Sequence, residues 1–226
     1  MPDQASSDFA KSMIKFMKDE YGVDPVYEAQ AGEKETDFRS FLLKAKAANP
    51  DAIVLSGLVD ETVRALKQSY EVGIPKSVAR VANSVASKVE VPTNAGKAAV
   101  GVTYAAAFAA SDKRPIAKKF VKKIKDTYGV VPGHDFSQMQ DLLDMLRPAL
   151  EKAQLKFSGN LAADRVAVRD SIASITNFTG LASGPIGFCA AGSPECRDGN
   201  KTPVMIEYTK GGKNWKTKVA GTVRFN

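Results

Sequence analysis

The sequence predicts an α/β protein built on a doubly wound parallel sheet, and two observations carry this prediction. Short apolar runs alternate with longer segments in which apolar residues recur at helical spacing. The run AIVL at residues 52–55 is apolar throughout, with Asn-Pro-Asp before it and Ser-Gly after it as turn signals. Such a run is typical of a parallel strand buried on both faces, and helix–strand alternation is typical of a doubly wound sheet.

The other elements are predicted in the same way, helices from apolar residues at helical spacing and strands from short apolar runs. Amphipathic helices are expected at residues 7–21, 38–48, 60–72, 115–128, 135–150 and 165–175. Further strands are expected at residues 25–30, 77–82 and 98–107, near Ile186, and at 204–208 and 215–219. We expect residues 52–55 to be an interior strand, covered by the helices at 38–48 and 60–72, and Asp60 to cap the second of these.

The composition fits a soluble globular protein. The chain has 226 residues, of which 44% are hydrophobic and 25% charged. No segment approaches the ~18 consecutive apolar residues of a membrane span, and the first residues lack the basic and apolar regions of a signal peptide. The net charge of +7 is spread along helix faces and is densest at residues 118–125. A solvated helix face is therefore favoured over a nucleic-acid site.

The two cysteines, Cys189 and Cys196, lie close together in a loop rich in Gly and Pro. Such a pair predicts a disulfide in an oxidising compartment, with two free thiols as the alternative. Two cysteines are too few for a zinc site, and His134, the single histidine, is far away in the sequence. We expect no metal.

No enzyme signature is present. The chain has neither a Gly-rich phosphate loop nor a nucleophile elbow, and His134 has no spaced partner. Asp141 and Asp144 lie one helical turn apart, which suits acid–base work, but carboxylates on an exposed helix face are usually solvated. We therefore expect a non-catalytic protein without a cofactor.

A binding site is expected at the carboxyl ends of the strands, where ligands bind in open α/β sheets. Ser56, Leu58 and Asp60 follow the strand at 52–55, and Asn83 and Ser84 follow the next one. The alternative is that these are ordinary loop and cap residues.

Four stretches together resemble a known family. They are GEKETDF at residues 32–38, KAKAANPDAIVLSG at 44–57, KQSYEVG at 67–73, and RDSIA at 169–173 followed by FTG at 178–180 and GPIGF at 184–188. In this order and at these separations they resemble the substrate-binding proteins of branched-chain amino acid ABC transporters, the leucine/isoleucine/valine-binding family.

The resemblance implies a type I periplasmic binding fold, in which two α/β lobes joined by three crossovers close around a ligand. Residues 1–107 would form the second lobe without its first strand, residues 108–190 the later part of the first lobe, and residues 191–226 the return to the second lobe. The resemblance further implies a non-catalytic solute receptor for amino acids or related small polar or aromatic compounds. Such receptors are periplasmic, act with a membrane permease and bind no nucleic acid.

The chain departs from the family at several contact positions. Ser6-Ser7 stand where the family often has Tyr-Gly, Leu58 where it can have a tyrosine, and Asn83 near a position that can hold an acid. The family's Tyr-Asp in a later helix is Gln140-Asp141 here. Loss of an acid that could hold an α-amino group suggests a ligand other than an amino acid. The expected ligand-binding residues are Ser6, Ser7, Ser56, Leu58, Asp60, Asn83 and Ser84.

The opening part of the first lobe and the first strand of the second lobe have no counterpart in the chain, which predicts a truncated form. A missing strand leaves an open sheet edge, through which we expect self-association. Two alternatives remain: a ligand-sensing regulator on the same fold, and a flavodoxin-like enzyme domain.

Overall fold

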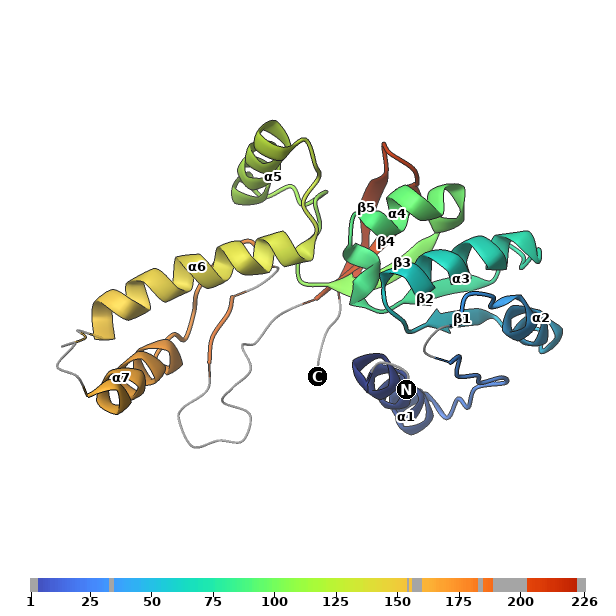
Figure 1. Ribbon diagram of the computed structural model, residues 1–226, viewed down its shortest axis with the longest axis horizontal. Coiled ribbons are helices and arrows are strands. Elements are labelled where there is room, and N and C mark those ends of the chain that lie inside the picture. Colours follow the sequence, from blue (N-terminus) through green and yellow to red (C-terminus); the bar gives the residue numbers. More distant parts are fainter. Residues whose placement is uncertain are drawn as a thin grey trace. The chain divides into compact units, whose positions relative to one another are not determined.

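A computed structural model describes residues 4–32, 35–153, 155, 160–182, 185–188 and 203–222 (Figure 1). The α-helices are α1 (Gln4–Tyr21), α2 (Arg39–Ala47), α3 (Val59–Glu71), α4 (Glu90–Ala95), α5 (Pro115–Tyr128), α6 (His134–Ala153) and α7 (Leu161–Ala173). Two short 3₁₀ helices are η1 (Ser84–Ser87) and η2 (Gly96–Ala99). The strands are β1 (Ala52–Leu55), β2 (Ala79–Ala82), β3 (Val102–Ala106), β4 (Val204–Lys210) and β5 (Lys216–Thr222).

The strands form one sheet in the order β1-β2-β3-β4-β5. β1, β2 and β3 are parallel, with Leu55 paired to Ala82 and Ala82 paired to Tyr104. The α/β class and the parallel pairing expected from the sequence are therefore confirmed. Because the three strands run the same way, their carboxyl ends lie at one edge of the sheet.

The chain divides into two compact units. Unit 1 comprises residues 1–106 and 205–220, and unit 2 comprises residues 107–204 and 221–226. The sheet lies almost entirely in unit 1, whereas unit 2 contains α5, α6 and α7. The assignment of residues 1–107, 108–190 and 191–226 to parts of two lobes stays a prediction.

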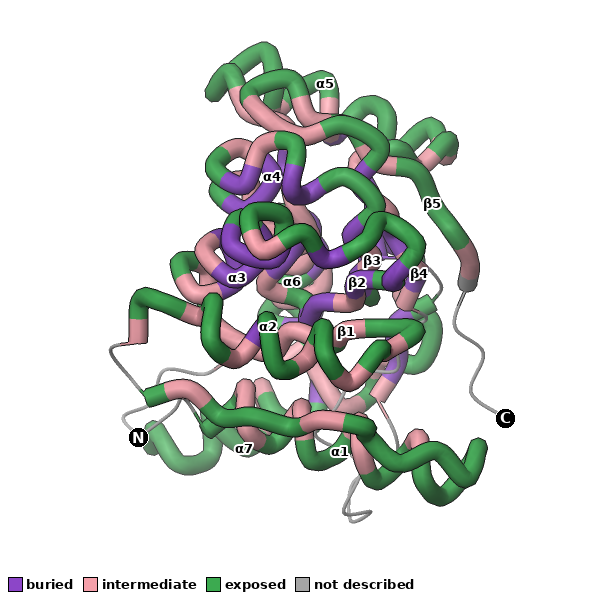
Figure 2. Tube along the Cα trace, turned by 90° about the vertical axis from the view of Figure 1, so that its right-hand side faces the viewer, coloured by how far each residue is buried: buried purple, intermediate pink, exposed green. Residues whose placement is uncertain are grey.

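The core of unit 1 is built by α3, α4, β2 and β3, which Figure 2 shows as the most deeply buried elements. α3 is strongly amphipathic and buries Leu66 completely. A second cluster joins α2 to β1 and the segment after α3: Leu42, Ile74 and Val78 are buried there, with Ile53 packed against them. Burial of one such aliphatic side chain stabilises the fold by about 1.5–3 kcal/mol.

Two tyrosines tie the last strands into this core. Tyr104 on β3 and Tyr208 on β4 are almost fully buried, with ring centroids 5.3 Å apart, and Trp215 packs edge-to-face on Tyr208. The Tyr208 hydroxyl donates a hydrogen bond to the carbonyl of Ala86 in η1. Burial raises the pKa of Tyr104 to about 12 and also raises the pKa of Tyr208, because the phenolate is poorly solvated there.

These two tyrosines predict a loss of stability in alkali. Their folded-state pKa values lie above the unfolded value of about 10, so their contribution is complete below about pH 10 and is lost as the pH rises towards about 12. We expect the urea midpoint to fall steeply above about pH 10 and the Tyr208→Phe variant to show a shallower decline. Equal alkaline slopes for the two proteins would contradict this account.

In unit 2, the buried carboxylate of Asp141 binds the backbone of the segment that follows α7. Asp141 on α6 is 2% exposed, and its two oxygens accept hydrogen bonds from the backbone N–H groups of Leu181 (2.6 Å) and Ala182 (2.8 Å). Arg114 donates to the carbonyls of Gly180 and Leu181 from the other side. The expectation that Asp141 is a solvated surface carboxylate is wrong. Asp144, one turn away, is exposed and accepts a hydrogen bond from Gln140.

Two strand predictions fail. β1 is the first strand of the sheet rather than an interior one, and its outward side chains, Ala52 and Val54, are exposed, Val54 at 46%. Residues 25–30 form no strand. A strand needs a neighbour with which its backbone can hydrogen-bond, and in the described residues β1 pairs with β2 alone.

Other boundaries differ by a few residues. The helix expected at 7–21 begins at Gln4, and the strand expected near Ile186 is a single bridge between Phe178 and Ile186. The disulfide predicted between Cys189 and Cys196 lies outside the described residues and stays a prediction. Within the described ranges, no helix combines the length and the apolar character that crossing a membrane requires.

Candidate functional site

The candidate site lies in unit 1, where β1 and β2 end side by side. The backbone N–H of Asn83 donates to the carbonyl of Leu55 at 3.1 Å, which continues the parallel ladder to the last residue of β1. Ser56 therefore follows β1 at the same level at which Asn83 follows β2. The structure thus brings together the two loops that the sequence predicted.

The start of α1 joins this edge. The Ser56 hydroxyl donates to the backbone carbonyl of Ser6 at 2.7 Å, although the two residues are 50 positions apart. Ser7, next along α1, accepts a hydrogen bond from the side chain of Gln30 at 3.4 Å. Ser6, Ser7 and Ser56 are all partly exposed, so all three remain accessible at the edge.

Asn83 is a buried polar residue at this edge. The residue is 9% exposed, and its side-chain amide donates to the carbonyl of Gly57 at 3.1 Å. Its side-chain oxygen is buried without a hydrogen-bond partner among the described residues, and the same holds for the hydroxyl of Thr62. The Thr62 hydroxyl lies near Gly57, since a Cβ built on Gly57 would be 3.9 Å from it. Buried polar atoms without partners are rare in native proteins.

The amino terminus of α3 lies beside these residues and contributes to the electrostatics of the site. Leu58 precedes the helix, is 49% exposed, and donates its backbone N–H to the carboxylate of Glu61 at 2.6 Å. Asp60 is exposed in the first turn and does not cap the helix, so the cap expected at Asp60 is wrong. The helix macrodipole gives this end a partial positive charge that favours anionic groups.

Sequence reasoning missed three residues that shape the site. Glu61 secures the start of α3, and its position three residues after Leu58 is the spacing of a capping box, which is the signal that could have revealed it. Thr62 carried no distinctive signal. Tyr208 holds η1, which contains Ser84, through the carbonyl of Ala86, and this contact spans 122 positions in the sequence.

This arrangement can hold a small polar ligand. It brings together Ser56, the start of α1, the buried Asn83 side chain and the amino terminus of α3, and within the described residues it holds no pair of titratable groups in hydrogen-bond contact for acid–base catalysis. Among the described residues, no group of three or more His, Cys, Asp or Glu side chains could hold a metal ion.

Comparison with known proteins places this geometry in context. The sequence profile of the family described as Periplasmic binding protein matches residues 2–195. The leucine binding protein LivK from Thermotoga maritima is 25% identical, with a TM-score of 0.71, and the match covers 88% of this chain and 51% of that one. No curated protein gives a significant match.

Two further structures share the fold at lower identity. LivJ from Streptococcus pneumoniae in complex with isoleucine is 22% identical, with a TM-score of 0.78 and coverage of 97% of this chain and 57% of that one. The solute binding protein from R. palustris in complex with benzoate is 15% identical, with a TM-score of 0.73 and coverage of 94% and 54%. The chain spans about half the length of these structures, and over that half it has their type I periplasmic binding fold. The chain belongs to the periplasmic binding protein family.

Proposed function

We propose that the chain is the solute-binding component of an ABC transporter and that its role is binding without catalysis. The observation that carries this proposal is the convergence of Ser6, Ser56 and Asn83 at the carboxyl edge of β1 and β2, beside the amino terminus of α3. Ligands of open α/β sheets bind at this edge. Membership of a family of binding proteins supports the same role.

The ligand class is amino acids or related small polar or aromatic compounds. Structures of the same fold hold isoleucine and benzoate, both of which carry a carboxylate. In this chain the positive end of α3 and the serine hydroxyls suit a carboxylate. Of the two acids in the first turn of α3, Glu61 is occupied by the N–H of Leu58, which leaves Asp60 for a ligand ammonium group. The serine hydroxyls and the helix end would take the carboxylate of the ligand, and an acid without an amino group would use these groups alone.

The partner is the membrane permease of such a transporter, and the location is the periplasm, as the family membership supports. These 226 residues cover 51–57% of the matched structures, so they supply about half of such a fold. Within the described residues β1 ends the sheet, and its four residues carry no charge. Such edges pair with other chains, so we propose self-association through β1.

The isolated chain is expected to bind small solutes weakly or not at all, and to self-associate, because receptors of this fold bury the ligand between two lobes. Calorimetry against branched-chain and polar amino acids, amides and aromatic acids, together with sedimentation, measures both properties. Adding the amino-terminal part of the fold, in one chain or as a separate fragment, should restore binding and monomeric behaviour. Micromolar binding by a monomer of the isolated chain would show that this expectation is wrong.

A further inference from the structure

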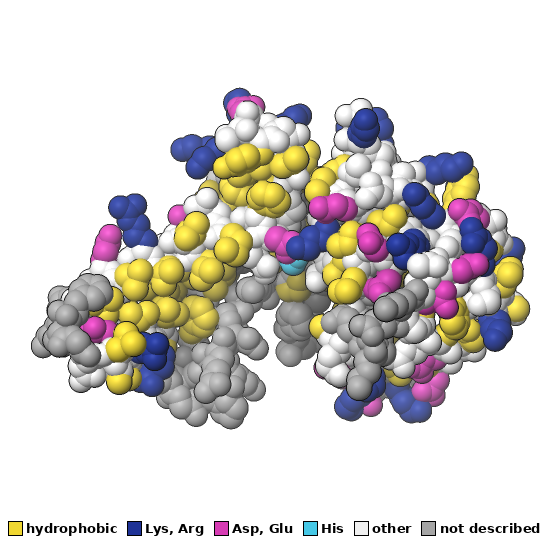
Figure 3. Space-filling view, viewed as in Figure 1, with side chains coloured by type: hydrophobic (Ala, Val, Ile, Leu, Met, Phe, Trp, Pro, Cys, Tyr) yellow, Lys and Arg dark blue, Asp and Glu magenta, His cyan; other side chains and the backbone are white. Residues whose placement is uncertain are grey.

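The solvent face of α5 is cationic. Of the 14 residues of this helix, five are exposed lysines: Lys118, Lys119, Lys122, Lys123 and Lys125. We call these five residues the α5 lysine face. The other side of the helix is packed, because Ala117 and Phe120 are buried in one cluster with Phe108. Figure 3 shows the same division, with dark blue basic side chains projecting from α5 and hydrophobic side chains gathered on one side of it. The five ammonium groups therefore lie on the side of α5 that the core does not use.

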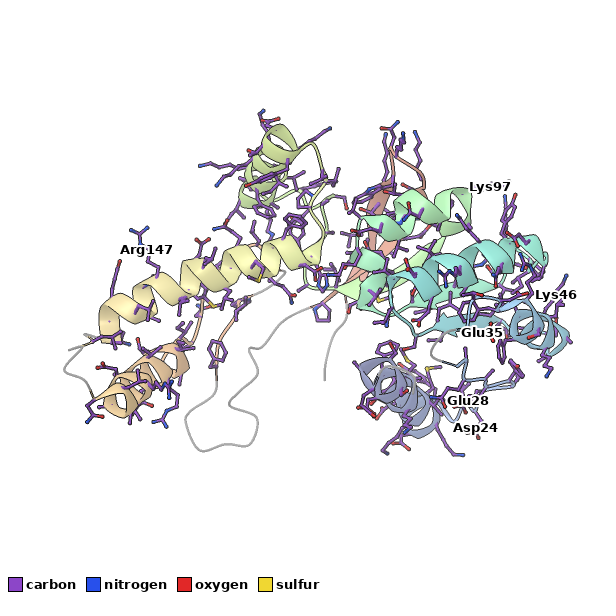
Figure 4. All side chains as sticks on the ribbon, viewed as in Figure 1. Asp24, Glu28, Glu35, Lys46, Lys97 and Arg147 are labelled. Carbon is purple, nitrogen blue, oxygen red and sulfur yellow. The ribbon has the colours of Figure 1, made fainter. Side chains whose placement is uncertain are left out.

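Few acids neutralise the α5 lysine face. α5 contains a single acidic residue, Asp126, which pairs with Lys122. The other four lysines form no ion pair within the described part of the chain. By contrast, Arg147 on α6, which is labelled in Figure 4, pairs with Glu151 one turn away. Five lysines and one aspartate give α5 a net charge of +4, which is more than half of the net charge of +7 of the whole chain.

The shape of the α5 lysine face suits an extended partner. Successive residues of an α-helix turn by about 100°, so the five lysines spread over an arc of roughly 160° along a helix of about 21 Å. Side chains that diverge in this way do not enclose a single ion. A small anion would meet one or two of them, whereas the long flexible stems of lysine let most of the ammonium groups reach a broad surface. The α5 lysine face therefore fits a large anionic surface better than a small anionic ligand.

A bilayer with anionic lipids is the surface that matches this face best. Clusters of about four to eight basic residues on an amphipathic helix are typical of binding to anionic lipid headgroups. Nucleic-acid surfaces add aromatic side chains on which bases stack, but Phe120 of α5 is buried and Tyr128 lies outside the lysine arc. We propose that the α5 lysine face docks the protein on the anionic headgroups of the membrane. The presence of a membrane rests on the proposed function, which places a permease beside the chain, whereas the docking does not depend on which solute is bound.

Flotation of the chain with lipid vesicles tests this docking, because self-associated protein does not float without lipid. We expect binding to vesicles of equal parts phosphatidylglycerol and phosphatidylcholine at about 0.1 M salt, and none to vesicles of phosphatidylcholine alone. Binding should be lost at about 1 M salt, where the screening length has fallen from about 10 Å to about 3 Å. The double variant Lys119→Gln/Lys123→Gln should bind about tenfold more weakly or less, since each basic residue near an anionic bilayer adds to the attraction. Glutamine has a helix propensity close to that of lysine, so the helix is retained.

Two controls separate the α5 lysine face from the overall charge. Lys15→Gln/Lys18→Gln removes the same charge from α1, where both lysines pair with acids, and should change binding by less than about twofold. Lys119→Arg/Lys123→Arg keeps the charge and should bind as the parent does.

Three results overturn the proposal: equal loss of binding in the α1 and α5 glutamine variants, equal binding of the parent to neutral vesicles, and no binding of the parent to anionic vesicles. The last includes a chain that binds a single-stranded oligonucleotide in place of the vesicles. The flotation assay contains no solute, so its failure leaves the proposed solute binding standing. Failure of the calorimetric test likewise leaves the docking standing.

Discussion

Replacing Asp141 with alanine should destabilise unit 2 by about 3–5 kcal/mol. The substitution leaves the N–H groups of Leu181 and Ala182 buried without an acceptor, and a hydrogen bond to a charged group contributes about 1.5–3 kcal/mol. Asp141→Asn keeps one acceptor oxygen, so we expect a smaller loss. Hydrogen exchange is the suitable measurement, because the amide protons of Leu181 and Ala182 report this contact directly.

Asp144→Ala is the control, one turn away on the same helix. Its carboxylate is exposed, so we expect a change within about 0.5 kcal/mol and unchanged exchange at Leu181. Equal effects of the two substitutions would refute the role assigned to Asp141. Gly180 lies against the same carboxylate, since a Cβ at this position would overlap Asp141 Oδ1.

Replacing Gly211 with alanine should release the turn between β4 and β5 from α4 and η2 and cost about 3 kcal/mol. A Cβ on Gly211 would overlap the carbonyl oxygen of Gly96, which is backbone and cannot move aside as a side chain does. The neighbouring N–H of Gly212 donates to the Pro92 carbonyl at 2.7 Å, so the same displacement breaks this hydrogen bond. Urea denaturation measures the loss.

Gly221→Ala is the matched control for this turn. Gly221 lies in β5, where a Cβ would meet nothing within 4 Å and the φ angle is ordinary. We expect the stability of this variant to be within about 0.5 kcal/mol of the parent. If Gly211→Ala is tolerated equally well, the turn does not dock against Gly96.

Periodicity predicted most of the helices, because their apolar stripes repeat regardless of what covers them. It located β1 at residues 52–55 but failed for the position of this strand in the sheet, since the run AIVL gives no information about which neighbours the strand has. An apolar strand that is buried on both sides and one that is left open have the same sequence pattern. The strand expected at residues 25–30 failed for a related reason: a suitable composition forms no ladder without a partner.

The candidate site was partly predictable because a general rule of parallel sheets places it. Ser56 and Asn83 follow neighbouring strands, and the structure shows them at one edge. The contacts that hold the site in place were not predictable. The contacts of Ser56 with Ser6 and of Tyr208 with Ala86 span 50 and 122 positions, and such distant pairs leave no mark in a local pattern. Asp141 was misjudged for the same reason, because its partners lie 40 residues later.

The most direct test of the central claim, that the carboxyl edge of β1 and β2 receives the ligand, is an NMR titration of the ¹⁵N-labelled chain with isoleucine and with benzoate. Because half of the fold is absent from these residues, we expect fast-exchange shifts at millimolar ligand. They should be confined to Ser56, Leu58, Asp60, Asn83 and Ser84 together with Ser6 and Ser7, and should be lost in the Asn83→Ala variant. Shifts confined to other parts of the chain, or shifts that Asn83→Ala leaves unchanged, would contradict the claim.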